Sequence, residues 1–306
     1  MGGGPAGAAC AARLVQAGLD CLVLDRAAFP RPKVCAGWVT PQVWRDLALD
    51  PAEYPHSLTR FDSFQIAVKR FRFKLRTHQY AIRRVEFDAW LLKRSGAPLA
   101  QHAAREIKAA EGGYALDGEF WGRYLIGAGG THCPVRTTLF GASPRPADAL
   151  IAAMEEEFPH PVTDPRCHLW FLQNGLPGYA WYVPKAGGFV NVGIGAAAQA
   201  LKKSGVSLRQ HWDALLVKLE QMGLVRGHSF RPVGHSYYLR RPGGPLRLDN
   251  ALLAGDSVGL ATLDMGEGIG PAVRSGQLAA EAVMNGGSYS LRNISRYSAW
   301  SLVLGG

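Results

Sequence analysis

A glycine-rich hexapeptide at the start of the chain has the composition of a phosphate-binding loop. Residues 2–7 read GGGPAG and fit the pattern G-x-G-x-x-G, whose glycines allow a tight turn and a close approach of the backbone to a pyrophosphate. The N–H groups at the start of the following helix would face the anion. Asp25 lies 18 positions after Gly7, where a carboxylate can accept hydrogen bonds from ribose hydroxyls. The pattern predicts a dinucleotide site, and a glycine-rich tail on an ordinary helix is the less favoured alternative.

A second carboxylate follows a second apolar run. Residues 251–254 read as a buried strand, and Gly255 and Asp256 come directly after it. Residues 266–269 (GEGI) then open a long helix, whose positive N-terminal end can stabilise an anionic group. A plain turn residue is the alternative for Asp256, and the helix that follows at once makes it less favoured.

A cysteine and an arginine could also take part in chemistry. Cys35 lies in an expected loop beside Lys33, and a nearby ammonium group favours a reactive thiolate. A small buried cysteine is an equally good interpretation. Arg84 could contact an anionic ligand, or it could be one more residue of a basic surface, since Arg83 is its neighbour.

Two aromatic residues in the middle of the chain could line a ligand pocket. Tyr179 and Trp181 alternate with smaller residues in an apolar run. For Trp181, a place in the core of a second sheet is the favoured interpretation.

Composition limits the class of protein. The chain has 306 residues, of which 47% are hydrophobic and 19% charged, and this excludes a disordered chain. No run approaches the roughly 18 apolar residues of a membrane span, and no secretory pattern opens the chain, so we expect a cytoplasmic protein. Five widely spaced cysteines argue against a disulfide scaffold or a zinc site.

The net charge of +10 suits a phosphorylated ligand or an anionic membrane surface, and nucleic acid is the weakest of the three candidates.

The elements that must position these residues follow from periodicity. Residues 61–76 alternate as a half-exposed hairpin, and 166–172, 179–183 and 189–194 read as further strands. Helices are expected over 5–17, 87–94, 207–222 and 268–284, and short strands over 21–24 and 124–126. We expect a discontinuous nucleotide-binding domain (1–60, 78–145 and 244–306) and a substrate domain (61–77 and 146–243).

Only Met1 precedes the glycine loop, whereas this loop normally follows a central hydrophobic strand. We therefore expect a missing first strand, a mobile loop at Gly2 to Gly7 and weakened cofactor binding.

Five stretches in order resemble the geranylgeranyl reductase family of FAD-dependent oxidoreductases, which is related to aromatic hydroxylases and flavin-dependent halogenases. They are Gly2 to Gly7 with Asp25-Arg26, residues 33–37 (KVCAG), Arg84 with residues 87–91 (FDAWL), residues 179–185 (YAWYVPK), and Gly255-Asp256 with residues 266–269. The resemblance implies an α/β fold, with a Rossmann-like FAD-binding domain and an inserted antiparallel β-sheet substrate domain.

The resemblance also implies particular site residues. Cys35, Tyr179 and Trp181 would act at the reacting centre. The residues that would contact FAD are Gly2, Gly4, Pro5, Ala6, Gly7, Asp25, Arg26, Lys33, Cys35, Ala36, Arg84, Gly130, Gly255, Asp256, Gly266, Glu267, Gly268 and Ile269. Asp256 would accept from ribityl hydroxyls, and free N–H groups of the helix after Gly268 would face the flavin ring. The chain departs from the family at Gly129, where an acidic residue is usual.

The expected activity is reduction of a carbon–carbon double bond in an isoprenoid or other hydrophobic substrate, with NAD(P)H as one candidate electron donor. A flavin-dependent monooxygenase or halogenase is the first alternative. The halogenase box Trp-x-Trp-x-Ile is replaced by Tyr179-x-Trp181-x-Val183, which ranks the halogenase lower. The second alternative is a truncated, non-catalytic protein with impaired FAD binding. The sequence gives no indication of an oligomeric state.

Overall fold

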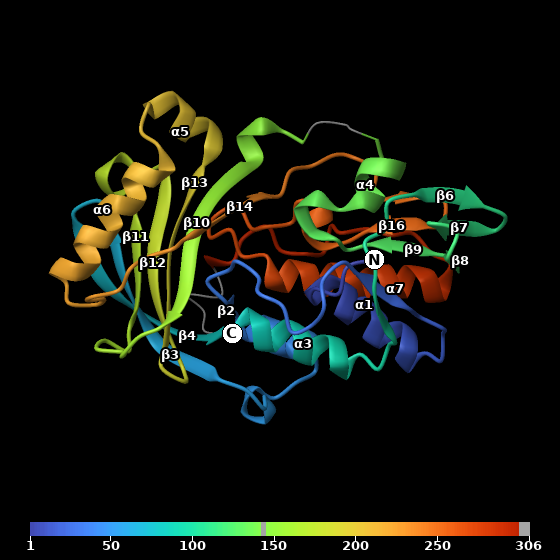
Figure 1. Cartoon of the computed structure of the whole chain (residues 1–306), viewed down its shortest axis with the longest axis horizontal. Helices are drawn as coiled ribbons and strands as arrows, with labels where there is room; N and C mark the ends of the chain where they lie inside the picture. The colour runs from blue at the N-terminus through green and yellow to red at the C-terminus, as the bar shows by residue number, and fades with distance from the viewer. Residues whose placement is uncertain (142–144, 300–306) are drawn as a thin grey trace.

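Two halves make up the computed structural model, which describes residues 1–141 and 145–299 (Figure 1). One half is a large curled sheet with two helices on its outer face, and the other packs long helices against short parallel strands (Figure 1). The α-helices are α1 (Pro5–Gln16), α2 (Pro41–Asp46), α3 (Arg84–Arg94), α4 (Pro134–Leu139), α5 (Ala198–Ser204), α6 (Leu208–Gln221) and α7 (Ile269–Asn285). None of them, over the described ranges, is long and apolar enough to cross a membrane.

The large sheet has eight strands in the order β14-β10-β13-β12-β11-β3-β4-β2. All neighbours are antiparallel except β11 and β3, which run parallel, so the sheet is mixed. Its strands are β2 (Trp38–Val39), β3 (Leu58–Val68), β4 (Phe71–Ile82), β10 (Leu150–Pro159), β11 (Cys167–Phe171), β12 (Gly178–Lys185), β13 (Phe189–Ala197) and β14 (Val233–Tyr238). The expected hairpin and the three expected middle strands are confirmed. β11 is one residue shorter at each end than expected, and the other strands extend beyond the expected ranges.

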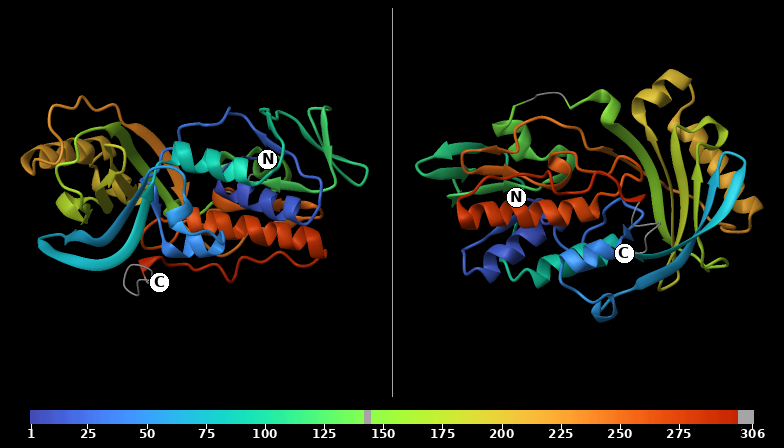
Figure 2. Two further views of the ribbon diagram at one scale, coloured as in Figure 1. Left: turned by 90° about the horizontal axis from the view of Figure 1, so that it is seen from below. Right: turned by 180° about the vertical axis from the view of Figure 1, so that it is seen from behind.

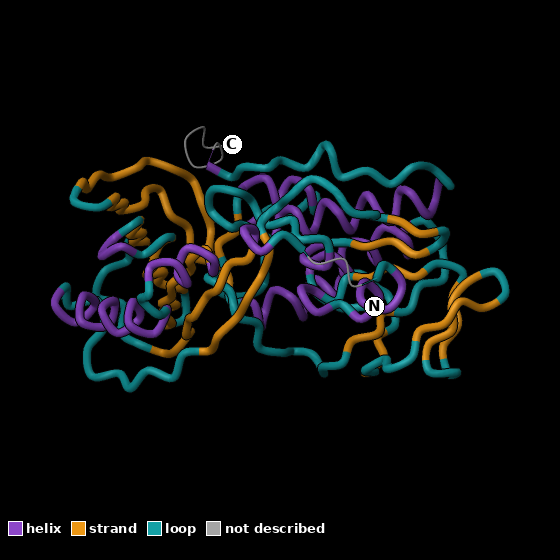
Figure 3. The backbone as a smooth tube through the Cα atoms, turned by 90° about the horizontal axis from the view of Figure 1, so that it is seen from above, coloured by secondary structure: helices purple, strands orange, loops and turns teal. Residues whose placement is uncertain are grey.

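The helical half carries three small sheets. Two belong to the expected Rossmann-like start: β1 (Val23–Asp25) with β5 (Leu99–Gln101), and β9 (Leu125–Gly127) with β16 (Ala251–Leu253) and β15 (Arg247–Leu248). The third is a meander of β6 (Ile107–Ala110), β7 (Gly113–Leu116) and β8 (Phe120–Gly122). Figure 2 shows α1 and α7 side by side next to the short strands, and Figure 3 shows helices and strands together in this half of the molecule.

The first two residues of the chain lie between β1 and β9. Gly2 N–H donates to the Leu24 carbonyl over 2.7 Å, and Ala128 N–H donates to the Met1 carbonyl over 2.8 Å. Backbone hydrogen bonds therefore connect the glycine loop to both short parallel sheets, at the position where a central strand was expected.

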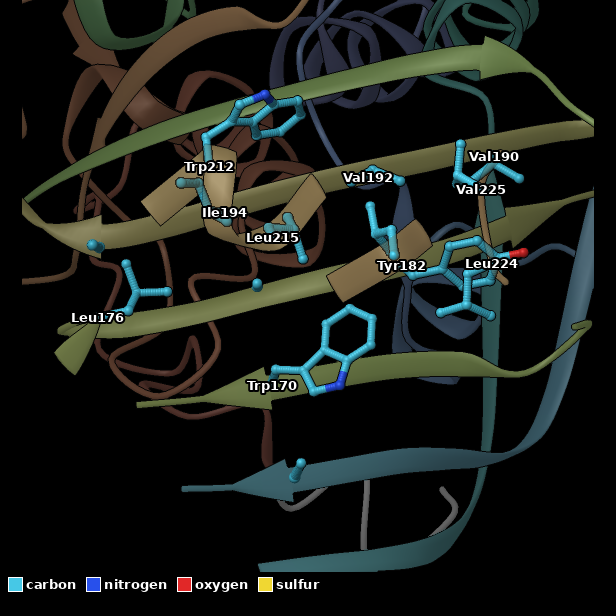
Figure 4. Packing of buried hydrophobic residues seen from close by; sticks show 14 of the residues in the cluster. Trp170, Leu176, Tyr182, Val190, Val192, Ile194, Trp212, Leu215, Leu224 and Val225 are labelled. Carbon is cyan, nitrogen blue, oxygen red and sulfur yellow. The ribbon is translucent and has the colours of Figure 1, made fainter. Parts of the chain in front are cut away.

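The large sheet has a different core on each face because side chains alternate along a strand. On the outer face, Tyr182, Val192 and Ile194 pack against Trp212 and other residues of α6, as Figure 4 shows. On the inner face, residues such as Phe64, Trp181 and Val183 pack towards Met265 of the helical half. Ser207 begins α6 with a capping box to Gln210, which fixes where this helix starts.

Candidate functional site

The glycine loop brings the start of α1 against the end of β9. Gly2 has a φ of +102°, and a side chain there would overlap the Ala128 carbonyl. A side chain at Gly7 would overlap the Gly2 carbonyl. Gly4 is the N-cap of α1 and, having no side chain, offers no capping acceptor, so N–H groups of the first turn, which follows Pro5, remain available. Both close approaches require glycine and leave a helix N-terminus that suits an anion.

Asp25 ends β1 and lies against the glycine loop. One carboxylate oxygen accepts from Gly3 N–H at 2.8 Å and the other from Ala27 N–H at 2.9 Å. The carboxylate thus orients the loop, which the sequence did not predict, and each oxygen keeps a lone pair for a ligand hydroxyl. The neighbouring Arg26 is exposed at the surface.

Arg31 is a charged residue of this site that sequence reasoning missed. Its guanidinium lies 4.0 Å from the Asp25 carboxylate and 3.7 Å from Asp88. The space above Gly4 opens towards it, because a methyl group at Gly4 would lie 3.6 Å from Arg31 Nη2. The only signal in the sequence was an arginine flanked by two prolines, which carries no specific chemistry.

Arg84 is buried at the start of α3 and forms two hydrogen bonds of 2.7 Å with the carboxylate of Asp88. The interpretation of Arg84 as part of a basic surface is therefore wrong. Asp88 contacts Arg31 as well, so this buried carboxylate holds two guanidinium groups near the glycine loop.

The loop at residues 33–37 connects the two halves of the molecule. Lys33 Nζ lies 2.9 Å from His235 Nε2 on β14, and Cys35 N–H donates to the carboxylate of Glu155 on β10. Burial lowers the pKa of His235 to about 4, so its neutral ring can accept from Lys33. Burial also raises the pKa of Glu155 to about 7, although Lys185 and the Cys35 N–H favour its ionised form. Cys35 itself is half-buried, and its Sγ accepts from Gly37 N–H at 3.3 Å.

Gly255 and Asp256 follow β16 where α1 meets α7. Gly255 has a φ of +66°, and a side chain there would approach Ala6 to 3.1 Å. Asp256 Oδ1 lies 3.5 Å from the position that a side chain at Gly268 would take. Asp256 therefore lies beside the start of α7.

The start of α7 differs from the expectation that its N–H groups are free. The buried carboxylate of Glu267 accepts a hydrogen bond from Gly270 N–H at 2.6 Å, so a side chain of the protein itself caps the helix. Burial raises the pKa of Glu267 to about 7. The side chain of Ile269 is buried in the core, so only its backbone can serve a ligand. Gly266 lies against the hydroxyl of Tyr237, and Gly130, with φ +76°, borders open space near β9.

Tyr179 and Trp181 line an apolar cavity on the inner face of the large sheet. Two lining residues come from outside the strands of the large sheet: Met265, next to Gly266, and Ala36, next to Cys35. The other lining residues are Trp38, Phe61, Phe64, Tyr80, Ala81, Cys167, Leu169 and Val183. The expected aromatic pocket is present, and Trp181 belongs to both the pocket and the sheet core.

The polar atoms of three lining aromatics are already bound by the protein. Tyr179 Oη donates to the Met265 carbonyl at 2.6 Å, Trp181 Nε1 to Asn191 Oδ1 at 2.7 Å, and Trp38 Nε1 to Gln79 Oε1 at 2.8 Å. These groups therefore need no partner from a ligand, and the wall presents hydrocarbon surface.

Comparisons with known proteins agree with this geometry. The NAD(P)-binding Rossmann-like domain family matches residues 1–34. An uncharacterised protein from Methanosarcina barkeri is 31% identical, over 92% of this chain and 73% of its own. A menaquinone reductase from Mycolicibacterium smegmatis is 28% identical over 99% of this chain and 79% of its own. A geranylgeranyl diphosphate reductase from Rhodobacter capsulatus is 27% identical over 93% of this chain and 74% of its own.

The chain belongs to the geranylgeranyl and menaquinone reductase-like family of FAD-dependent oxidoreductases. It is therefore an FAD-dependent reductase of this family, and the expected fold class is confirmed. A geranylgeranyl bacteriochlorophyll reductase-like structure from Thermoplasma acidophilum has a TM-score of 0.80 at 21% identity, and covers 98% of this chain and 79% of its own. The flavin-dependent halogenase CmlS has a TM-score of 0.70 at 18% identity, and the match covers 93% of this chain and 57% of the halogenase. Reductases and halogenases thus share this fold, so the reaction must be inferred from the residues of the site and not from the fold.

Proposed function

We propose that this reductase saturates a carbon–carbon double bond of an isoprenoid chain held in the inner-face cavity. The hydrocarbon wall formed by Tyr179, Trp181 and their neighbours carries the proposal, because a polar substrate would lose its hydration there without gaining partners. The similarity to a geranylgeranyl diphosphate reductase and to a digeranylgeranylglycerophospholipid reductase supports the same substrate class.

The residues around the glycine loop fit FAD. The uncapped start of α1 and the nearby guanidinium of Arg31 suit its pyrophosphate, and Asp25 suits its adenosine ribose. Asp256, for which no ion pair is found within the described ranges, suits the ribityl hydroxyls at the other end. We propose that the two carboxylates bind opposite ends of the cofactor. The division into a nucleotide-binding domain and a substrate domain, with the boundaries expected above, remains part of this proposal.

When bound, reduced FAD supplies the hydride, and the protein must exclude water and supply a proton to the other alkene carbon. Cys35 adjoins Ala36 of the cavity wall, and the hydrogen bond from its backbone to Glu155 fixes its loop. We propose that Cys35 positions or relays this proton. Cys35→Ala should retain bound flavin and slow substrate reduction at least tenfold. Cys21→Ala, between α1 and β1, is the control, and equal turnover in both variants would leave Cys35 with a structural role.

The direct test supplies geranylgeranyl diphosphate and menaquinone to the flavin-loaded protein under anaerobic conditions. Dithionite first provides the electrons, and NADH and NADPH are then compared as donors. Mass spectrometry should detect a product that has gained two hydrogen atoms for each double bond reduced. Oxygen-dependent hydroxylation or halogenation of an aromatic substrate, without alkene reduction, would instead favour the monooxygenase or halogenase.

We also propose that the β3–β4 hairpin brings the protein to an anionic membrane, where isoprenoid lipids reside. Phe71 and Phe73 are 65% and 49% exposed near its tip. Five cationic residues surround them, namely Lys69, Arg70, Arg72, Lys74 and Arg76. Exposed aromatic rings among basic side chains suit insertion at a negatively charged lipid surface. Figure 2 shows the hairpin at one edge of the molecule.

Vesicle sedimentation tests this interaction. The protein should bind vesicles that contain phosphatidylglycerol more strongly than pure phosphatidylcholine vesicles, and less strongly at high salt. The double variant Phe71→Ser and Phe73→Ser should lose most of this binding. Equal binding by the variant and the parent would contradict the role of the hairpin and leave the proposed alkene reduction unaffected.

A further inference from the structure

Two buried polar side chains on the inner face of the large sheet connect the cavity wall to the loop that carries Cys35. Glu155 of β10 and Asn191 of β13 are 5% and 0% exposed. Glu155 pairs with Gly193 and Gly193 pairs with Trp181, so Glu155 shares a face with the indole. Asn191 precedes Gly193 by two residues and lies on the same face. Polar groups buried in a largely apolar face need specific partners, and their contacts indicate their role.

Asn191 contacts the cavity wall with one end of its amide and the loop with the other. Its Oδ1 accepts from Trp181 Nε1 at 2.7 Å. The indole N–H can only donate, which fixes the orientation of the amide. Asn191 Nδ2 then lies 3.5 Å from the Cys35 carbonyl oxygen and 3.5 Å from Glu155 Oε1. Neither a carboxylate nor a hydrocarbon side chain could make all three contacts.

Glu155 holds the same loop by its other backbone group, because its carboxylate accepts from the Cys35 N–H. Glu155 and Asn191 therefore contact both the N–H and the carbonyl of Cys35. A hydrogen bond to a carboxylate is stronger than one between neutral groups, so we expect Glu155 to contribute more than the long Asn191 contact. The Cys35 side chain is half-buried, and its Sγ accepts from Gly37 N–H.

Gly193 allows the indole and Glu155 to lie close together. A side chain at this position would lie 2.2 Å from Trp181 Cζ2 and 2.8 Å from Glu155 Cβ. The ring therefore lies over the glycine, and Asn191 contacts both the ring and the carboxylate. Trp181, Asn191, Glu155 and the Cys35 backbone thus form one contiguous network.

We propose that Glu155 and Asn191 are positioning residues that place the Cys35 thiol relative to Trp181 of the cavity wall. This inference rests on the proposed function, in which Cys35 positions or relays a proton. Within the described part of the chain, neither Glu155 nor Asn191 lines the cavity, so both act through the residues that they hold.

Alkylation of Cys35 by iodoacetamide tests the placement in the flavin-free full chain, without any substrate. Peptide mass spectrometry follows the rate at each cysteine. Glu155→Leu should raise the rate at Cys35 about fivefold or more, because its N–H loses a charged acceptor. Glu155→Gln retains an acceptor and should stay within about twofold of the parent. Both variants lack the carboxylate charge, so the comparison isolates the hydrogen bond.

The link to the cavity wall is tested by a double-mutant cycle. Asn191→Leu should raise the rate at Cys35 by about two- to threefold, less than Glu155→Leu, because its contact with the loop is longer. Trp181→Phe removes the indole N–H and should raise the rate when Asn191 is present. In the Asn191→Leu background it should have no further effect, because the connecting side chain is already absent. Additive effects would overturn the link.

Glu156→Leu is the matched control. This neighbouring glutamate points to the opposite face of β10 and bonds His228, so its loss should leave the rate at Cys35 unchanged. The other four cysteines are internal references: Cys21 is half-buried, and Cys10, Cys133 and Cys167 are buried. A rise confined to Cys35 supports the proposal. An equal rise at all five would overturn it, because Glu155 would then stabilise the whole fold.

Two further alkylation results would overturn the proposal. One is an equal rate at Cys35 in Glu155→Leu and the parent. The other is a rise in Glu155→Gln as large as in Glu155→Leu, because charge alone would then explain the change.

Turnover separates this inference from the proposed function. With an active isoprenoid substrate, Glu155→Leu should lower kcat about tenfold, and Glu155→Gln should recover most of it. Faster alkylation with an unchanged kcat would overturn the positioning role in the reaction. Absence of alkene reduction in the parent would instead defeat the proposed function, and the alkylation rates would still report how Glu155 and Asn191 hold Cys35.

Discussion

The two carboxylates proposed to hold FAD differ in what already binds them. Asp25 accepts from two backbone N–H groups and lies near Arg31, so its loss would disturb the glycine loop as well as a ligand contact. Asp256 lies beside Gly268, and no ion pair to it is found in the described part of the chain. Asp256 therefore offers the cleaner substitution for testing cofactor binding.

Asp256→Ala should weaken FAD binding by roughly 1–3 kcal/mol, the range for removing a hydrogen-bonded partner in a site. Titration of the flavin-free protein, followed by flavin fluorescence, measures this change. Asp62→Ala, which removes a highly exposed carboxylate on β3, is the control and should bind FAD like the parent. An unchanged affinity in Asp256→Ala would remove this residue from the site.

Glu267 makes stability depend on pH. Its pKa is about 7 in the folded protein, against 4.5 for an ordinary glutamate, because burial disfavours its charge. As pH rises from about 4.5 to 7, the unfolded chain loses this proton first, so the free energy of unfolding falls across that window. Glu267→Gln keeps an acceptor for Gly270 N–H and does not titrate.

The flavin-free Glu267→Gln variant should therefore become more stable relative to the parent as pH rises from 5 to 8. The gain should be on the order of 3 kcal/mol at most, from a pKa difference of about 2.5. Thermal melts at several pH values measure it. Glu220→Gln, at an exposed position of α6, is the control. A stability difference that stays constant with pH would show that Glu267 does not titrate in this window.

At the scale of elements, periodicity predicted the long helices α1, α3, α6 and α7 and about half of the strands. It missed the short helices α2, α4 and α5 and several strands, among them β10 in the interior of the large sheet. Its residues 155–157 are three consecutive glutamates, which no buried strand is expected to contain. Each finds a partner from a distant segment: Glu155 binds the Cys35 N–H, Glu156 binds His228, and Glu157 binds Lys185. These contacts compensate the charges of the three carboxylates only after the chain has folded, so the local sequence could not reveal them.

In the candidate site, too, the sequence predicted the local motifs but not the contacts between distant segments. The glycine loop, Asp25 and Asp256 were predictable because their spacing relative to apolar runs encodes a local strand–turn–helix unit. Arg31, Asn191 and His235 were not predictable, because their roles come from contacts with residues far away in the sequence. The capping of α7 by Glu267 is instead a local contact to Gly270: the motif at the start of the helix was recognised from the sequence, but the direction of the Glu267 carboxylate was not.

The close packing of α1 against α7 sets the geometry of the helical half. Gly276 of α7 lies so close to α1 that a side chain there would overlap the Ala6 carbonyl. Gly276→Ala should therefore destabilise the protein by about 1–3 kcal/mol through overpacking, although alanine favours helices intrinsically. It should also weaken FAD binding, because the glycine loop begins α1.

Gly287→Ala is the matched control for that prediction. Gly287 follows α7, has no positive φ and has nothing within 4 Å of the position of a new side chain. Chemical denaturation should separate the two variants. Equal stability of Gly276→Ala and the parent would show that the two helices can move apart at little cost.

At the scale of the whole molecule, the loop at residues 33–37 joins the two halves. Lys33 contacts His235 on β14, and Cys35 contacts Glu155 on β10 and, through its carbonyl, Asn191 on β13. The same loop adjoins the cavity wall at Ala36. A cofactor that extends from the glycine loop to this region would contact both halves, and its binding free energy would add to the stability of the native state.

Stability should therefore depend on how much of the cofactor is present. FAD at 100 times its dissociation constant should stabilise the protein by about 2.7 kcal/mol, and the melting temperature should rise by several degrees. At the same concentrations, FMN and then riboflavin should stabilise it less, since FMN lacks the adenosine half and riboflavin also lacks phosphate for the α1 N-terminus and Arg31. Differential scanning fluorimetry on one protein preparation compares the three compounds directly. Equal shifts with riboflavin and FAD would mean that the glycine loop does not bind the pyrophosphate, whereas a graded series would support an extended cofactor held at both of its ends.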